Sequence, residues 1–346
     1  MSSASPVSPG DPPGGRHVTV LEREVCDALA PCFPGPGEPP AGILVDATAG
    51  GAGHTLALLA RTRPERAILF DRDPRALAIA RERLHGAACP VELIGAPFST
   101  LTEGLAALGV TGPARDGHGG VSAIVADLGV SSFQLDTAER GFSLRADAPL
   151  DMRMDPTSGP TLAEVLAEID TASLARILHE YGEEPDARRI AEAIVAARPR
   201  TTLDLANTVT VAMSARQRRR LGRRIHPATR TFMALRIHLN RELDELDRFL
   251  DQAPELLRVG GRLAVISFHS LEDRRVKHRM RQLGRAPEVP VHLPITQREL
   301  PRPSFTIPRG YGPGVVPSEE EIDRNPRARS ARLRVLERRL PPSDRG

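Results

Sequence analysis

A glycine-rich turn lies between two apolar segments early in the chain, in the sequence Asp46-Ala-Thr-Ala-Gly-Gly-Ala-Gly-His-Thr55. Glycines there let the backbone approach a ligand closely, and the first turn of a following helix offers unpaired N–H donors. A turn of this kind between a strand and a helix serves NAD, FAD and S-adenosylmethionine alike, and its spacing is not a clean GxGxxG. It therefore predicts a nucleotide-containing ligand without saying which.

Asp71 ends the next apolar segment, 67–70. A carboxylate at the end of this strand can accept hydrogen bonds from both ribose hydroxyls of an adenosine. The alternative is that Asp71 only caps the following turn, a task for which Asp73 is better placed. We expect Asp71 to bind ribose.

A third acid, Asp127, ends the apolar segment 121–126 and is followed by Leu-Gly-Val-Ser-Ser-Phe-Gln134. In methyltransferases built on a parallel sheet this strand end faces the transferred methyl group. Enzymes that methylate amino groups often carry an Asp or Asn there, with adjacent prolines and an aromatic residue. Here Leu-Gly replaces the prolines. The rival, an NAD-dependent enzyme, would explain the glycines and Asp71 but not Asp127.

Arginines crowd into the segment 216–236. Guanidinium groups offer planar, bidentate donors to phosphate, so this patch is typical of an RNA contact. Arginine-rich genomic composition or a solvated helix face would give the same pattern. The residues expected to bind RNA are Arg218, Arg219, Arg223, Arg230 and Arg236.

His269 follows a predicted strand at 263–266 and either acts on the substrate or forms structural hydrogen bonds at the strand end. Glu272 and Asp273 are typical first-turn helix acids. A metal site at His269 and Glu272 is disfavoured because the sequence offers no third ligand. The chain has only three cysteines and no CxxC pair, so we predict no metal.

The elements that position these residues alternate between strands and helices in the first half of the chain. Asp73 and Pro74 are typical of an N-cap and the first helical position. The alternation predicts a parallel, doubly wound sheet. Strands are predicted at 43–46, 67–70, 91–94 and 121–126, and helices at 53–63, 74–84 and 98–108.

From about residue 136 to residue 240 the pattern is helical, with no convincing strand. The alternation then resumes with a turn at Gly260-Gly261, the strand at 263–266 and a final strand at 331–336. The simplest account is a helical domain inserted after the fourth strand, where loops surround the ligand site. Helices are predicted within it at 171–181, 185–197 and 202–213, and a short strand near Phe305 interrupts an otherwise irregular segment, 286–317.

Composition limits the class of protein. Of the 346 residues 40% are hydrophobic and 3% aromatic, so the core is aliphatic and binding of single strands by base stacking is disfavoured. Isolated cysteines fit a reducing compartment, and no apolar run is long enough to span a membrane. Residues 1–15 are rich in Ser, Pro and Gly, and we expect a disordered tail rather than a signal peptide. We therefore expect a cytoplasmic protein.

A series of motifs in order along the chain resembles one family, the bacterial 16S ribosomal RNA cytosine-N4 methyltransferases, RsmH or MraW. The resemblance runs from about His17 to Arg338. The motifs are Asp127-Leu-Gly-Val-Ser-Ser132, Gln134-Leu-Asp136, Glu139-Arg-Gly-Phe-Ser143, Leu150-Asp-Met-Arg-Met-Asp155, Tyr181-Gly-Glu-Glu184, His226-Pro-Ala-Thr-Arg-Thr-Phe232, Ile266-Ser-Phe-His-Ser-Leu-Glu-Asp273 and Asn325-Pro-Arg-Ala-Arg-Ser330.

The resemblance implies an α/β fold, with a Rossmann-like S-adenosylmethionine-dependent methyltransferase domain at 16–135 and 241–340 and an inserted all-helical substrate-binding domain at 136–240. It implies methylation of the N4 amine of a cytosine in the decoding region of 16S ribosomal RNA. Asp127 is our candidate catalytic residue, the alternative being that it only binds the cofactor. The implied cofactor contacts are Ala52, Gly53, His54, Asp71, Phe98, Asp127 and Gln134.

The family usually has Gly where this chain has Ala52. Alanine restricts positive φ, and we expect Gly51 to compensate. The departure also favours a second rival, a ribosome-assembly protein that has lost turnover. Ser131, Ser132 and Phe133 are candidates to line the base pocket, although Phe133 fits a core position equally well. The sequence leaves open whether the partner is free RNA or the assembled small subunit, and whether the chain is a homodimer.

Overall fold

The computed structural model describes residues 19–113, 119–221, 226–286 and 302–340. Its centre is a seven-stranded sheet in the order β3-β2-β1-β4-β5-β7-β6. The strands from β3 to β5 are parallel, and β7 is antiparallel to both β5 and β6. The strands are β1 Ile43–Asp46, β2 Arg66–Phe70, β3 Val91–Ile94, β4 Val121–Asp127, β5 Leu257–Ser267, β6 Phe305–Thr306 and β7 Arg332–Arg338.

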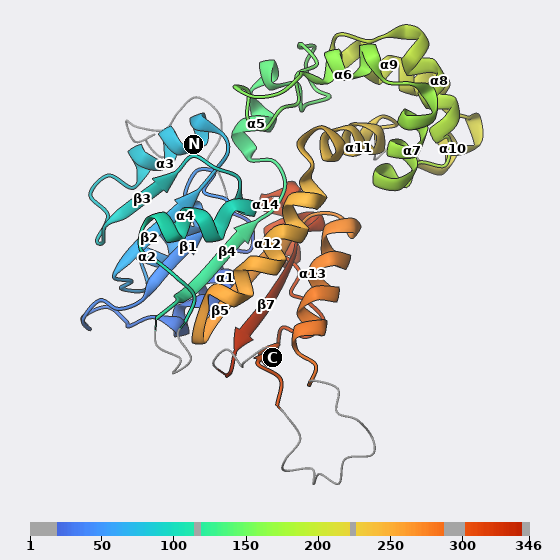
Figure 1. Cartoon of the computed structure of the whole chain (residues 1–346). Coiled ribbons are helices and arrows are strands. Elements are labelled where there is room, and N and C mark those ends of the chain that lie inside the picture. The colour runs from blue at the N-terminus through green and yellow to red at the C-terminus, as the bar shows by residue number, and fades with distance from the viewer. Residues whose placement is uncertain (1–18, 114–118, 222–225, 287–301, 341–346) are drawn as a thin grey trace, which may run out of the picture.

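Helices cover both faces of this sheet (Figure 1). Because successive side chains of a strand point to opposite faces, Leu44 packs with α1–α3 in one apolar cluster, while Val45 packs with α4, α12 and α13 in the other. The helices are α1 Glu22–Leu29, α2 Gly53–Leu59, α3 Pro74–Arg83, α4 Leu101–Ala107, α12 Glu242–Leu256, α13 Ser270–Leu283 and α14 Glu319–Arg324, with 3-10 turns η1 Ala30–Cys32, η2 Phe98–Thr100 and η4 Pro326–Ser330.

The segment between β4 and α12 forms a second, helical part with its own core (Figure 1). No named strand falls in its described residues; only an isolated bridge joins Pro149 to Thr201. The division of the chain at about residues 136 and 240 stays our proposal. The elements are α5 Ser132–Asp136, η3 Ala138–Arg140, α6 Leu162–Glu168, α7 Thr171–Gly182, α8 Ala187–Ala197, α9 Thr202–Ala212, α10 Ala215–Leu221 and α11 Thr229–Asn240.

The predicted strands and most helix starts are confirmed, and Asp73 caps α3 by accepting from the Arg75 N–H. Three predictions are wrong in detail. The helix predicted at 98–108 begins with the 3-10 turn η2, and α4 starts only at Leu101. Helix α2 ends at Leu59 rather than Arg63. The glycine pair at 260–261 does not precede the strand but lies within β5, where the register jumps from Val121↔Leu257 to Ala123↔Arg262. Among the described residues, no helix is both long enough and apolar enough to cross a bilayer.

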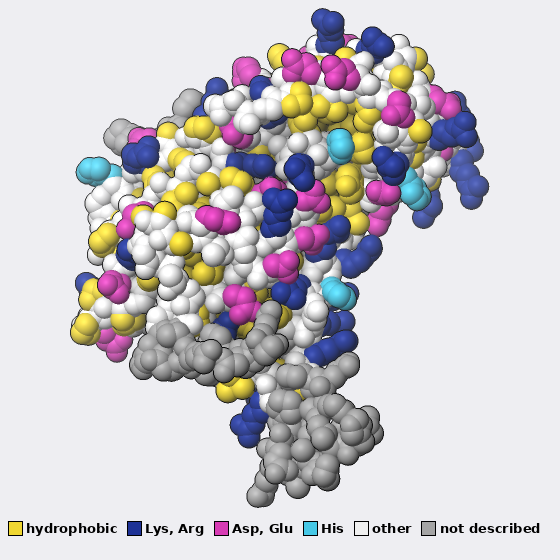
Figure 2. All heavy atoms as spheres, viewed as in Figure 1, with side chains coloured by type: hydrophobic (Ala, Val, Ile, Leu, Met, Phe, Trp, Pro, Cys, Tyr) yellow, Lys and Arg dark blue, Asp and Glu magenta, His cyan; other side chains and the backbone are white. Residues whose placement is uncertain are grey.

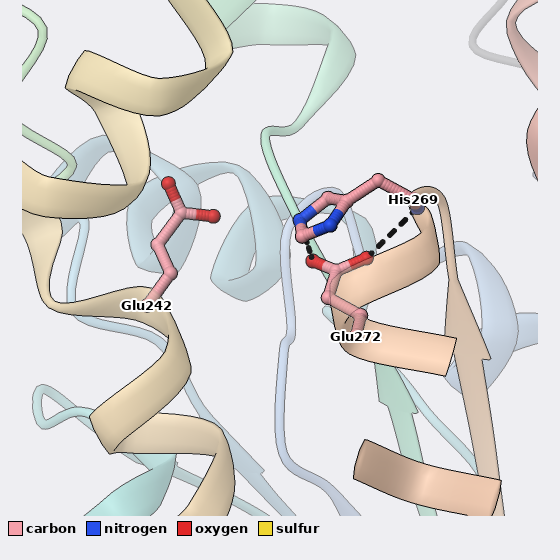
Figure 3. Close-up of side chains that lie close together, drawn as sticks. All are labelled: Glu242, His269 and Glu272. Atoms are coloured by element: carbon pink, nitrogen blue, oxygen red, sulfur yellow. Dashed lines mark hydrogen bonds and ion pairs between the residues drawn. The ribbon is translucent and has the colours of Figure 1, made fainter. Parts of the chain in front are cut away.

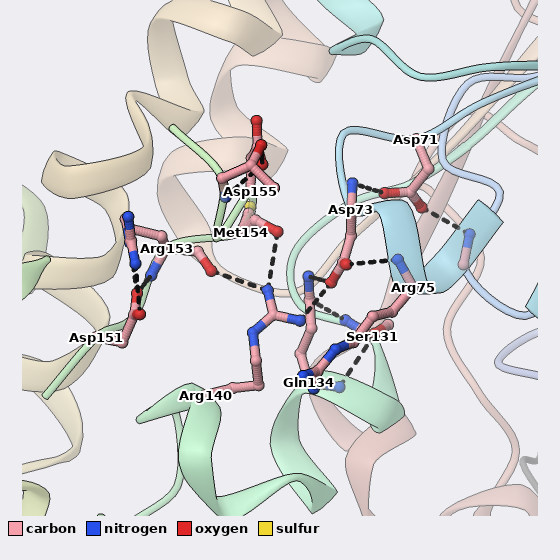
Figure 4. Close-up of polar contacts among 12 residues, drawn as sticks. Asp71, Asp73, Arg75, Ser131, Gln134, Arg140, Asp151, Arg153, Met154 and Asp155 are labelled. Carbon is pink, nitrogen blue, oxygen red and sulfur yellow. Dashed lines mark hydrogen bonds and ion pairs between the residues drawn. The ribbon is translucent and has the colours of Figure 1, made fainter. Parts of the chain in front are cut away.

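A buried ion pair ties the segment after β4 to the sheet (Figure 4). Arg140 Nη1 lies 2.6 Å from Asp73 Oδ2, which also accepts from Gln134 Nε2 at 3.0 Å. Arg140 Nη2 donates to the carbonyls of Arg153 and Met154, both at 2.9 Å. Both charged side chains are more than nine-tenths buried, so each depends on the other to offset its loss of hydration.

Breaking this pair should destabilise the whole protein. Arg140→Leu leaves Asp73 charged and buried, and we expect it to lower the free energy of unfolding by about 3–5 kcal/mol, measured by urea denaturation. The control is Arg188→Leu, which removes an exposed pair with Glu192 on α8 and should cost about 0–1 kcal/mol. Equal losses in the two variants would contradict the role given to the buried pair.

Candidate functional site

A cavity of about 340 Å³ opens at the carboxyl edge of the sheet. Its size is in the range of small-molecule sites. Its wall is formed by the turn after β1, by the residues at the ends of β2 and β4, and by Met154, which lies between η3 and α6. Its lining includes Thr19, Asp46, Thr48, Gly50, Gly51, Gly53, His54, Asp71, Arg72, Phe98, Asp127, Ser131, Ser132, Gln134, Met154, Arg236, Phe268, Asn325 and Arg327.

The turn after β1 is shaped by two residues in the left-handed region, Gly50 at φ 48° and Ala52 at φ 57°. The expectation that Gly51 would compensate for Ala52 is therefore wrong, because Ala52 adopts the positive φ itself. Ala52 is fully buried and, unlike the other predicted cofactor contacts, does not line the cavity. Gly51 is needed for another reason: a Cβ there would lie 2.9 Å from Phe133 Cε2.

Both carboxylate oxygens of Asp71 accept backbone hydrogen bonds, from Gly50 N and from Asp73 N, each at 2.8 Å. The interpretation that Asp71 caps the next turn is confirmed, and since the residue also lines the cavity, ribose binding stays a prediction. Burial raises the pKa of Asp71 to about 6, against the lowering effect of these two N–H donors. The carboxylate is rigidly held, with one lone pair on each oxygen left for a ligand.

Asp127 lies beside a buried histidine. Its backbone N–H donates to Thr48 Oγ1 at 2.6 Å, and its Oδ2 lies 3.5 Å from His54 Nε2. The second acid here, Asp46, is held by Thr55 Oγ1 at 2.7 Å, and burial raises its pKa. Asp127 Oδ1 is buried without a hydrogen-bond partner among the described residues, which suits a carboxylate that meets a ligand.

Phe98 and Gln134 also line the cavity, as predicted for cofactor contacts. Phe98 packs edge-on against Phe249 of α12, with ring centroids 5.3 Å apart. Both ends of the Gln134 amide are already engaged: Oε1 accepts from Ser131 N and Nε2 donates to Asp73. Gln134 is therefore part of the scaffold as well as of the wall.

A second cavity, of about 390 Å³, adjoins the first. The two share Val130, Leu135, Arg236, Phe268 and Arg327. Of the predicted base-pocket residues, Ser131 and Ser132 line the first cavity, and Phe133 lines neither. The remaining wall of the second cavity comes mainly from the helical part and consists of Phe142, Ser143, Leu144, Arg145, Met152, Thr229, Phe232, Met233 and His269.

Two residues of the C-terminal segment, Asn325 and Arg327, complete the wall of the first cavity. Arg327 also lines the second cavity and pairs with Asp136 of α5. Sequence reasoning gave neither residue a role. The only signal that could have found them is the motif 325–330, which carried the family resemblance.

The structure supplies the third ligand that the sequence lacked: oxygens of Glu242 and Glu272 and a ring nitrogen of His269 all lie within 4.8 Å of one another (Figure 3). Every carboxylate here is already engaged. Arg236 Nε and Nη2 donate to the two oxygens of Glu242 at 2.7 and 2.8 Å. Glu272 pairs with His269 at 3.1 Å and accepts from Phe268 N at 2.8 Å.

A metal ion would have to displace Arg236 from Glu242 in this cluster. Burial tends to raise the pKa of Glu272, but His269 and Arg236 hold it below its usual value. The cluster is therefore better described as a buried Arg236–Glu242 ion pair between α11 and α12 that lies next to the His269–Glu272 contact at the start of α13.

The predicted RNA-binding arginines differ in exposure and in what they contact. Arg218 and Arg219 are exposed on α10, at an edge of the helical part where basic side chains gather (Figure 2). Arg230 is partly exposed and donates to the carbonyl of Glu183. Arg236 forms an ion pair with Glu242 and lines both cavities, so it does not belong to the exposed basic patch on α10. Arg223 lies outside the described residues.

Comparison with known proteins gives a consistent result. Residues 15–339 match the MraW methylase family. The chain is 44% identical over 333 residues to the ribosomal RNA small subunit methyltransferase H of Synechococcus elongatus, covering 96% of this chain and 98% of that protein. It is 46% identical over 306 residues to the protein of the same name from Bordetella petrii, covering 87% and 79%.

Among solved structures, an rRNA methylase from Streptococcus thermophilus covers 92% of this chain and 95% of its own, at 15% identity and a TM-score of 0.36. A TM-score this low does not by itself establish a shared fold.

The left-handed conformation of Ala52 can be tested directly. A positive φ costs a residue with a side chain about 1–2 kcal/mol. Ala52→Gly relieves this but makes the unfolded chain more flexible, so we expect a free energy of unfolding unchanged or up to about 1 kcal/mol higher. The control, Ala106→Gly on the exposed side of α4, should lower it by about 1 kcal/mol. A similar loss in both variants, measured by urea denaturation, would contradict the turn geometry.

Proposed function

Because this chain belongs to the MraW methylase family, we propose that it transfers a methyl group from S-adenosylmethionine to the N4 amine of a cytosine in the decoding region of 16S ribosomal RNA. The observation that carries the proposal is the pair of adjoining cavities, the first lined by Asp71 and Asp127 and the second largely apolar. They offer separate places for a donor and for an acceptor base.

The residues of the first cavity fit the cofactor. Its turn lets backbone approach a ligand at Gly50 and Gly51, and Asp71 keeps acceptor capacity for ribose hydroxyls. When bound, the sulfonium supplies an electrophilic methyl group. The carboxylates of Asp46, Asp71 and Asp127 stabilise a positive charge at this edge of the sheet.

Asp127 is the residue placed to act on the acceptor. The N4 amine of cytosine is a poor nucleophile because its lone pair is delocalised into the ring. A carboxylate that accepts a hydrogen bond from N4 orients the amine and favours a pyramidal nitrogen. Orientation contributes up to about 7–11 kcal/mol to catalysis, whereas general-base assistance contributes about 10²–10⁴-fold in rate. We infer that Asp127 acts mainly by positioning.

The second cavity suits the base. A nucleobase must leave its stack to be methylated at an exocyclic amine, which costs a few kcal/mol unless it is already unpaired. Phe142, Phe232 and Met233 provide apolar surface for a flipped pyrimidine, and Arg145 and Arg327 provide cations near its backbone. Ala52 fits the turn without displacing it, so the feature that favoured a protein without turnover loses its weight.

The test is methyl transfer to small ribosomal subunits, and to free 16S RNA, from a strain lacking the protein, with mapping of the modified nucleotide. We expect a single N4-methylated cytosine. Asp127→Ala should lower the rate of a single turnover by at least about 10²-fold at saturating cofactor. Normal turnover in this variant would exclude a role for Asp127 beyond cofactor binding, and a different modified atom would overturn the proposed acceptor.

The arginines of α10 should determine how strongly binding depends on salt. In Arg218→Gln/Arg219→Gln we expect weaker RNA binding and a slope of log K against log salt reduced by about 0.7–0.9 for each phosphate that is no longer neutralised. Fluorescence anisotropy at several salt concentrations measures this. The matched control is Arg75→Gln/Arg81→Gln on the exposed face of α3. If affinity for S-adenosylmethionine falls equally, the cause is misfolding instead of a weaker attraction to RNA.

A further inference from the structure

His54 is a buried histidine whose side chain is only 6% exposed, yet it reaches the wall of the first cavity. Neither ring nitrogen has a hydrogen-bond partner among the described residues. Leaving a polar group buried and unpaired is costly, so an imidazole held this way calls for an explanation. Its Nε2 lies 3.5 Å from Asp127 Oδ2, slightly beyond an ordinary hydrogen bond. A shift of a few tenths of an ångström would close the contact.

The charged groups with the largest effects on His54 are acids: Asp127 at the end of β4 first, then Asp46 at the end of β1 and Glu22 of α1. Burial lowers the pKa of His54, but these acids, Asp127 above all, outweigh it and raise the pKa above its usual value. The side chain is therefore able to hold a proton under conditions where most histidines are neutral.

We propose that His54 takes up, by way of Asp127, the proton that the acceptor amine loses on methylation. This inference rests on the proposed function. The new N–C bond forms as the C–S bond breaks, and the electron pair of the C–S bond stays on sulfur. The N–H bond then breaks and leaves its electron pair on nitrogen. The proton passes to the Asp127 carboxylate and from there to Nε2 of the neutral imidazole. After the product leaves, the proton returns through Asp127 to water.

The geometry distinguishes this role from the two others open to the residue. A cofactor contact alone would not require the ring to lie beside Asp127, in the field of Asp46. The other buried histidine near the cavities, His269, has its Nε2 3.1 Å from Glu272, which lines neither cavity, whereas His54 lies beside Asp127, whose Oδ1 is still unpaired at the cavity wall. His54 acts through Asp127 and does not itself reach the base, so it is a positioning residue that also stores a proton.

The informative variant is His54→Gln. Glutamine can place an amide near Asp127 but cannot take up a proton.

In wild type the single-turnover rate should rise with pH until His54 is neutral and then level off. In His54→Gln we expect a plateau about a hundredfold lower. Its rate should no longer follow the titration of His54, because glutamine does not titrate. Affinity for S-adenosylhomocysteine, measured by calorimetry, should fall by much less than the rate, since His54 also lines the cofactor cavity. The control His85→Gln, exposed after α3 and in neither cavity, should match wild type.

Two results would overturn the inference. If His54→Gln keeps the wild-type rate and pH profile, the residue only orients Asp127. If cofactor affinity falls by the same factor as the rate, it is a cofactor contact. A wild-type chain that methylates no N4 amine would instead refute the proposed function.

A second measurement does not depend on how His54→Gln folds. NMR of histidine-labelled protein bound to S-adenosylhomocysteine should show His54 titrating with a raised pKa, which falls in Asp127→Asn. A His54 pKa that does not respond to Asp127→Asn would also exclude the proton transfer.

Discussion

Three carboxylates must share one edge of the sheet, because β1, β2 and β4 are adjacent and parallel and each ends in an acid or is followed by one. Placing three acids together at a partly buried edge is unfavourable unless each finds donors or a cation. Asp46 is satisfied by a threonine hydroxyl and Asp71 by two backbone N–H groups. Asp127 keeps an unpaired oxygen among the described residues, and in the function we propose this difference separates the residue that acts on the acceptor from the two acids that hold the turn.

The same constraint reaches the inserted helices. Asp73, two residues after Asp71, is neutralised by Arg140, and Arg140 in turn fixes the carbonyls of Arg153 and Met154. Met154 belongs to the cavity wall, so the ion pair that stabilises the junction also sets the shape of the site. Asn240 reinforces it from α11 by accepting from the Met154 N–H and donating to the carbonyl of Met152.

Arg236 illustrates how position in the fold changes the meaning of a charged residue. From its neighbours in sequence it belongs to an arginine-rich stretch suited to phosphate. In the structure it lines the two cavities and pairs with both carboxylate oxygens of Glu242, one member of the potential metal-binding triad. Because a guanidinium keeps its charge at all accessible pH values, it balances the buried acids permanently, which a histidine there could not do.

Residue order alone was enough to predict the succession of strands and helices, the acids at 71 and 127 that line the cavity and the helical character of 136–240. These features depend on local periodicity, on capping residues such as Asp73-Pro74 and on the rule that parallel strands share an edge. Local rules of this kind act over a few residues.

Folding in three dimensions was needed to establish that Ala52 takes the positive φ, that Glu242 joins His269 and Glu272, and that residues 325 and 327 close the cavity. The same holds for His54 beside Asp127. Except for the Ala52 conformation, each of these arrangements joins residues from separate elements. Such contacts depend on how side chains pack against one another, on which the spacing of residues along the chain carries no information.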